Sequence, residues 1–117
     1  RGNTATELVR MAREAGAAKV YLASYSPPLL YPCPYGIDMS TKREFIARDK
    51  TMDELAKVFD CDAIVYQDLS DMVAAARVGN AKIERFCTAC FDGEYPTGDI
   101  TAEVLEAIEN ERISVQV

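Results

Sequence analysis

The chain has 117 residues, 49% of them hydrophobic and 27% charged, which is typical of one globular domain and excludes a disordered chain. Its net charge is −6, from 13 basic and 19 acidic residues without a basic block, so we expect no nucleic-acid partner. No apolar run approaches the roughly 18 residues of a membrane span, and the first residues do not resemble a signal segment, so we expect no membrane association and a cytoplasmic location.

The first third of the chain predicts a helix, a strand and a stiff loop. Thr4 and Glu7 have the spacing of a capping box, and the helix that they open is expected to stop at Gly16. Residues 19–24 are rich in strand formers. Residues 26–36 hold four of the chain's five prolines, which excludes a helix or a central strand and predicts a long surface loop of the kind that often carries function.

Two more capping boxes predict helices in the middle of the chain. Thr41 and Glu44 are expected to open a short helix that runs through Ile46. Thr51 and Glu54 are expected to open the next helix, which carries an apolar stripe on one face.

The following segments continue the alternation of strands and helices. Residues 63–66 form an uninterrupted apolar run between acids and predict a buried strand. A helix is expected to begin at Asp68 or Ser70, and residues 82–91 are expected to hold a short strand.

The last segments are a turn at 94–98, a helix over 101–109 and a tail from Ile113 that is expected to be a strand or a frayed end. Helices that alternate with apolar strands predict an α/β fold with a mainly parallel sheet flanked by helices. The strand that such a fold needs before the first helix is not present. We therefore expect residues 1–117 to be a fragment of a single domain, with 101–117 as its C-terminal helix and tail.

A turn before the first helix has the features of an anion site. It consists of Arg1, Gly2, Asn3 and Thr4. A glycine at that position lets backbone N–H groups approach an anion, and the helix dipole favours negative charge there. Most such turns bind nothing, so this pattern alone is a weak indication of a phosphate site.

Three of the four cysteines are candidate metal ligands, and the fourth is a candidate core residue. Cys87 and Cys90 form a C-x-x-C, and Cys33 lies in the proline-rich loop. Because the chain has no histidine, a thiolate-only set suits an iron–sulfur cluster or zinc, and buried thiols without a metal are the alternative. Cys61, before the predicted strand at 63–66, is expected to be a small core residue, with a role as a substitute ligand as the less favoured alternative.

Five segments together resemble one protein family. They are Arg-Gly-Asn-Thr at 1–4, Met-Ala-Arg-Glu-Ala-Gly-Ala at 11–17, Tyr-Pro-Cys-Pro-Tyr-Gly-Ile-Asp-Met at 31–39, Tyr-Gln-Asp-Leu at 66–69 and Cys-Thr-Ala-Cys-Phe-Asp-Gly-Glu-Tyr-Pro-Thr at 87–97. Their order resembles the amidophosphoribosyltransferases, also called glutamine phosphoribosylpyrophosphate amidotransferases. The resemblance covers nearly the whole chain but only the C-terminal portion of that family's phosphoribosyltransferase domain.

This resemblance implies a phosphoribosyltransferase-like fold and the first step of de novo purine biosynthesis. In that reaction phosphoribosyl pyrophosphate, bound with Mg²⁺, and glutamine give 5-phosphoribosylamine, glutamate and pyrophosphate. The implied partners are an N-terminal glutaminase domain, purine nucleotides and further copies of the chain in a tetramer. The family's catalytic groups have no counterparts in this chain, so the resemblance implies no catalytic residue here and an inactive isolated fragment.

The resemblance also implies roles for particular residues. Residues 1–4 would bind the 5′-phosphate, although Asn3 stands where the family usually has Thr and offers an amide donor instead of a hydroxyl. Ile37 and Asp38 would lie at the glutaminase interface on the ammonia path. The three cysteines of the metal hypothesis match the ligands of the family's 4Fe–4S cluster, whose fourth ligand lies outside this chain; they are Cys33, Cys87 and Cys90.

Two alternatives remain open from the sequence. One is a different phosphoribosyltransferase, against which the C-x-x-C segment and the Gly-x-Tyr-Pro that follows it argue. The other is a non-enzymatic α/β domain that binds a metal through cysteines or has a regulatory role.

Overall fold

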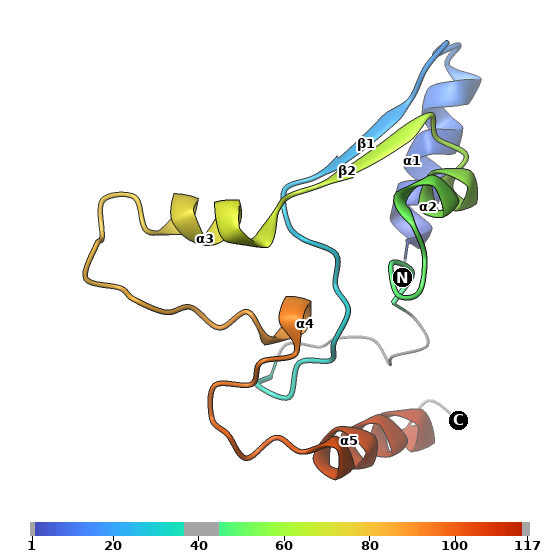
Figure 1. The fold of residues 1–117 in the computed structure, drawn as a ribbon. Helices are drawn as coiled ribbons and strands as arrows, with labels where there is room; N and C mark the ends of the chain where they lie inside the picture. Colours follow the sequence, from blue (N-terminus) through green and yellow to red (C-terminus); the bar gives the residue numbers. More distant parts are fainter. Residues whose placement is uncertain (1, 37–44, 116–117) are drawn as a thin grey trace.

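Seven helices and strands follow one another in residues 2–36 and 45–115, the part of the chain that this computed structural model describes (Figure 1). In chain order they are α1 (Asn3–Glu14), β1 (Tyr21–Ser24), α2 (Met52–Phe59), β2 (Ala63–Tyr66), α3 (Leu69–Ala76), α4 (Ala89–Asp92) and α5 (Ala102–Val115).

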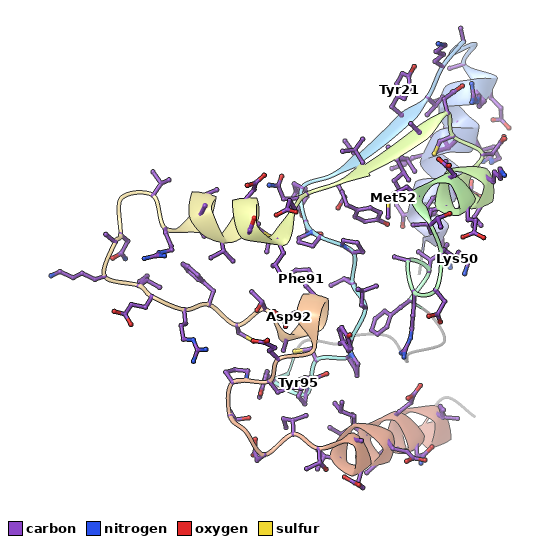
Figure 2. The ribbon with its side chains drawn as sticks, in the orientation of Figure 1. Tyr21, Lys50, Met52, Phe91, Asp92 and Tyr95 are labelled. Atoms are coloured by element: carbon purple, nitrogen blue, oxygen red, sulfur yellow. The ribbon has the colours of Figure 1, made fainter. Side chains whose placement is uncertain are left out.

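The sheet of the described residues is a pair of parallel strands. β1 and β2 pair in register from Tyr21 with Ala63 to Ser24 with Tyr66. Helices α1 and α2 lie on one side of this pair (Figure 1). On the other side Tyr21 remains 61% exposed, and its side chain projects away from the helices (Figure 2). The predicted α/β fold with parallel strands is therefore confirmed, with a small sheet that is covered on one face.

The main core lies between the strands and the two helices. Leu55 and Phe59 of α2 are almost fully buried and pack with Val9 of α1. Cys61 is buried in the same cluster, which confirms its predicted role as a small core residue.

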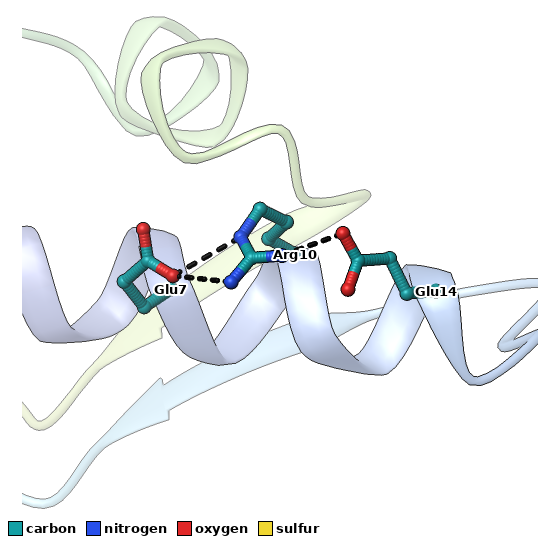
Figure 3. Close-up of polar contacts among 3 residues, drawn as sticks. All are labelled: Glu7, Arg10 and Glu14. Atoms are coloured by element: carbon teal, nitrogen blue, oxygen red, sulfur yellow. Dashed lines mark hydrogen bonds and ion pairs between the residues drawn. The ribbon is translucent and has the colours of Figure 1, made fainter.

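Helix α1 begins differently from the prediction. Gly2 is the N-cap in the left-handed region, at φ 84°, and Thr4 lies inside the helix, so the predicted Thr4 capping box is wrong. Only a residue without Cβ adopts this φ at no cost, and it lets the helix begin before Thr4. Along the exposed face, Arg10 bonds to Glu7 and Glu14 (Figure 3), a solvent-exposed network that contributes little to stability.

The caps of α2 and α3 agree with the sequence. The Thr51 hydroxyl accepts from the Glu54 N–H, and the Glu54 carboxylate accepts from the Thr51 N–H at 2.7 Å, which completes the predicted capping box. Asp68 caps α3 by accepting from the backbone N–H groups of Ser70 and Asp71.

Three predicted elements are wrong. Phe45 has no regular structure and residues 46–49 form turns rather than the end of a helix, whereas 41–44 lie outside the described residues. Residues 82–91 hold no strand, because no neighbouring strand pairs with them in the described chain, and helix α4 begins within them instead. The apolar residues from Ile113 continue α5 to Val115 rather than forming a strand.

The described chain is open rather than closely packed. Its radius of gyration is 16.8 Å, compared with about 13 Å for a compact domain of this length. Helix α3 has no buried residue and α5 lies apart from the sheet (Figure 1). None of the helices in the described part is long and apolar enough to cross a membrane.

Candidate functional site

A cavity of about 490 Å³ lies beside the carboxyl ends of the two strands. Residues from five segments line it: Gly2 and Ala5 of α1, the end of β1 and the loop after it, residues 45–47, Phe59 of α2, and Ile64 and Tyr66 of β2. Ligands of open α/β sheets bind outside the carboxyl ends of the strands, so this cavity is where such a fold is expected to hold one.

The predicted phosphate turn touches this cavity through one residue. Gly2 lines it, while Asn3 and Thr4 are exposed in the first turn of α1. No side chain caps this helix, unlike α2 and α3, and the first amides of any helix lack intrahelical partners. The helix dipole adds partial positive charge at the same place. Arg1 lies outside the described residues.

Close packing holds Gly2 in position. A Cβ at this residue would lie 2.6 Å from the Ile46 Cδ1 atom and 2.8 Å from the Phe59 Cε1 atom. The backbone of the turn therefore rests directly on two core side chains. An anion at this turn would meet a fixed backbone rather than a flexible loop.

Polar groups at the strand ends are already engaged. The Ser24 hydroxyl donates to the Ser26 carbonyl at 3.0 Å. The Asp68 carboxylate accepts from the Ser70 hydroxyl at 2.7 Å as well as from the α3 amides, and these hydrogen bonds lower the pKa of Asp68. Asp68 thus acts as the cap of α3, in agreement with a helix that begins there.

The cysteine segments meet at a second location. Cys33 is buried against Phe45, and Cys90 packs on this pair. The Cys90 carbonyl accepts from the backbone N–H groups of Leu30 and Tyr31, at 3.0 and 3.1 Å. Burial raises the pKa of the Cys90 thiol, and the nearby Cys33 and Cys87 thiols add to the increase.

Tyrosines join the same two segments. Tyr95 donates a hydrogen bond to the Pro32 carbonyl at 2.8 Å, and its ring meets Tyr35 edge to face with centroids 6.2 Å apart. The Tyr35 and Thr97 hydroxyls lie 2.9 Å apart. Figure 2 shows Tyr95 just after α4, beside the loop. The proline-rich loop and the segment after the C-x-x-C therefore lie side by side.

The structure brings together only part of the predicted metal set. Cys90 packs on the cluster of Cys33 and Phe45, whereas Cys87 is exposed. Within the described ranges, no three cysteine or carboxylate side chains form a group that could hold a metal ion. Ile37 and Asp38, predicted for the domain interface, lie outside those ranges.

Sequence reasoning missed two kinds of contact. Arg13 pairs with Asp62 at 2.7 Å. The same carboxylate accepts from the Val20 N–H at 2.7 Å, which is the main cause of its lowered pKa. The bond from Tyr95 to Pro32 was also missed. Both contacts join residues far apart in sequence, and no local spacing could have indicated them.

Comparison with known proteins gives a consistent result. No protein-family model matches the chain. It is 45% identical over 112 residues to the amidophosphoribosyltransferase of Pseudomonas aeruginosa, and 40% identical over 112 residues to that of Escherichia coli. Each match covers 96% of this chain and 22% of the relative, so the chain spans about a fifth of their length.

Solved structures give the same result. A structure described as the allosteric regulatory enzyme of purine biosynthesis superposes with a TM-score of 0.75 at 35% identity, over 93% of this chain and 24% of the other. The glutamine phosphoribosylpyrophosphate amidotransferase of B. subtilis, complexed with ADP and GMP, gives a TM-score of 0.70 at 32% identity, over 89% of this chain and 24% of the other.

Proposed function

From the membership of this chain in the amidophosphoribosyltransferase family, we propose that it forms part of the phosphoribosyltransferase domain of such an enzyme. The intact protein would convert phosphoribosyl pyrophosphate and glutamine to 5-phosphoribosylamine, glutamate and pyrophosphate, the first step of de novo purine biosynthesis. This chain would contribute substrate binding rather than a catalytic residue.

The observation that carries this proposal is the uncapped N-terminus of α1 on the wall of the cavity. A phosphate there would accept hydrogen bonds from the backbone N–H groups of residues 2–4, assisted by the helix dipole. Asn3 is exposed beside them and can donate through its side-chain amide. Arg1 belongs to the same proposed site.

The proposed contribution to the reaction is positioning. Ribosyl transfer with loss of pyrophosphate develops positive charge on the sugar, so the rate depends on how firmly the phosphate groups fix the ribose. Gly2 supports this role, because its backbone is held against Ile46 and Phe59. Mg²⁺ would accompany phosphoribosyl pyrophosphate and neutralise its charge.

Further partners belong to the same proposal. Ile37 and Asp38 would contact an N-terminal glutaminase domain, along the path by which ammonia reaches the sugar. Purine nucleotides would regulate the intact enzyme, which would be a cytoplasmic tetramer.

We also propose that Cys33, Cys87 and Cys90 bind a 4Fe–4S cluster, with the fourth ligand outside these residues. Support comes from the packing of Cys90 on the cluster of Cys33 and Phe45 and from the absence of histidine, which leaves thiolates as the soft ligands. Cys87 would have to move toward the other two, and it is exposed in a segment without regular structure. A bound cluster would serve as a cross-link between the two loops.

Anaerobic reconstitution of the full protein with iron and sulfide tests the cluster. We expect broad absorbance near 400 nm, which Cys33→Ser abolishes. Cys61→Ser is the matched control, because Cys61 is equally buried but belongs to the main core. Absorbance that survives Cys33→Ser, or that never forms in the wild-type protein, contradicts the cluster.

An activity assay on the full protein tests the proposed function. Glutamate and pyrophosphate should be released only when glutamine and phosphoribosyl pyrophosphate are both present. Gly2→Ala should raise KM for phosphoribosyl pyrophosphate, because it displaces the turn from its support. Residues 1–117 expressed alone should form no product. A full protein that consumes neither substrate would overturn the proposal.

A further inference from the structure

We propose that Tyr95 is a positioning residue that holds Cys33 beside Cys90. This role rests on the proposal that these thiols bind a cluster, but the contact that carries it does not depend on a metal.

The decisive contact is the hydrogen bond from the Tyr95 hydroxyl to the Pro32 carbonyl, at 2.8 Å. That carbonyl belongs to the peptide bond between Pro32 and Cys33. The bond therefore fixes the plane from which the Cys33 side chain extends. Since Pro32 already has a restricted φ, this bond at its carbonyl also restricts its ψ, and so the orientation of the peptide plane that leads into Cys33.

Neighbouring contacts hold the two segments together on either side of this bond. Leu30 and Tyr31 donate to the Cys90 carbonyl before it, and Tyr35 pairs with Thr97 after it. Tyr31 also packs so closely on Gly93 that a Cβ there would lie 2.9 Å from the tyrosine ring. Within the described chain, Tyr95 is the residue that donates a hydrogen bond to the carbonyl of the peptide bond between Pro32 and Cys33.

The burial of Pro32 and Cys33 makes the loss of this hydrogen bond costly. Pro32 and Cys33 are both buried, so the Pro32 carbonyl has no ready replacement from water if the Tyr95 hydroxyl is removed. Desolvation raises the pKa of Tyr95, and nearby groups including Cys33 add to the increase. The hydroxyl therefore keeps its proton and remains a donor at neutral pH.

The test is alkylation of each cysteine by iodoacetamide in the metal-free full protein, followed by mass spectrometry of the peptides. Tyr95→Phe removes only the hydroxyl. We expect it to speed alkylation of Cys33 about fivefold, the factor for one lost hydrogen bond of about 1 kcal/mol. Tyr21→Phe is the control variant, because Tyr21 is 61% exposed on the outer face of the sheet.

The other cysteines serve as internal controls. Cys87 is already exposed and should react at the wild-type rate in Tyr95→Phe. Cys61 is buried in the main core, so it reports general loosening of the fold. A Cys33 rate within twofold of the wild-type rate, or an equal acceleration of Cys61, would overturn the positioning role.

A second measurement separates this inference from the cluster proposal. In the reconstituted protein, Tyr95→Phe should shorten the lifetime of the absorbance near 400 nm in air about fivefold, and Tyr21→Phe should not. If the wild-type protein forms no cluster, the cluster proposal fails, and the alkylation rates still decide whether Tyr95 positions Cys33. An unchanged lifetime in a protein that does form the cluster would overturn the positioning role.

Discussion

Single residues fix the backbone at the points on which the proposed phosphate site depends. Gly2 has φ 84° and no room for a Cβ, whereas Gly16 has φ 93° and open space where a Cβ would lie. The two glycines therefore share a left-handed backbone and differ in their surroundings. An alanine at Gly16 would therefore meet only the cost of the left-handed backbone, whereas an alanine at Gly2 would also clash with its neighbours.

We predict that Gly2→Ala destabilises the protein more than Gly16→Ala. Gly16→Ala should cost about 1 kcal/mol, from the left-handed backbone alone. Gly2→Ala should cost roughly 1–3 kcal/mol more, because the new methyl group conflicts with Ile46 and Phe59. Urea denaturation of both variants measures the difference. Equal losses would show that the turn is not packed as described.

Asp62 predicts a dependence of stability on pH. Its pKa is lowered in the folded state, mainly by the Val20 N–H and also by Arg13. A group with a lowered folded pKa stabilises the fold above its unfolded pKa, and this stabilisation is lost as the pH falls through the folded pKa. Stability should therefore decline as the pH falls from the ordinary value of 3.8 to lower values.

Asp62→Asn should flatten this decline. Other carboxylates with lowered pKa, such as Glu54 and Asp68, remain in the variant, so part of the dependence should persist. Chemical denaturation across the acid range measures the slope. A slope identical to that of the wild-type protein would mean that the contacts of Asp62 with Val20 and Arg13 are not maintained in solution.

At the scale of the elements, the sequence predicted the helices and strands that depend on neighbouring residues better than those that depend on pairing with a distant segment. The capping box of Thr51 and the apolar run at 63–66 located α2 and β2 correctly, because both signals are read from neighbouring residues. The predicted burial of β2 was wrong: none of its residues is buried, and Val65 is 61% exposed, because helices cover only one face of the strand pair. Residues 82–91 have strand-forming side chains, but a strand needs a partner, and none lies beside them in the described chain.

The candidate site was predicted in part for the same reason. Gly2 precedes α1 as the sequence predicted, whereas Asn3 and Thr4 lie inside the helix, and phosphate binding by these residues stays a prediction. The proximity of the loop that holds Cys33 to the segment that holds Cys90 was expected from the resemblance. The bond from Tyr95 to Pro32 and the cavity wall formed by Phe59 depend on how distant segments pack, which the sequence does not reveal.

The caps give a prediction at this scale. Thr51→Ala should cost about 1 kcal/mol, because it removes one side of the capping box of α2. Thr4→Ala should cost almost nothing, because Thr4 is exposed within α1 and is not its cap. Thermal or urea unfolding of both variants measures this contrast. A larger loss for Thr4→Ala would restore the capping box that the sequence suggested.

In the described residues, the main core is accompanied by the smaller cluster of Cys33 and Phe45, and several elements lie outside both. α1, α2 and the two strands share the main core, whereas α3 has no buried residue. For residues 1–117 studied alone, we predict that the amides of α3 exchange with deuterium much faster than those of α2. Hydrogen exchange with mass spectrometry measures this difference. Equal protection of α2 and α3 would contradict the described packing.

A crystal structure of the full protein with ribose 5-phosphate tests the proposed phosphate site most directly. We predict that the phosphate lies within hydrogen-bond distance of the backbone N–H groups of residues 2–4, at the N-terminus of α1. The N-termini of α2 and α3, which Thr51 and Asp68 already cap, should hold no phosphate. A phosphate bound elsewhere, with the amides of residues 2–4 paired to other protein groups, would contradict the proposed site.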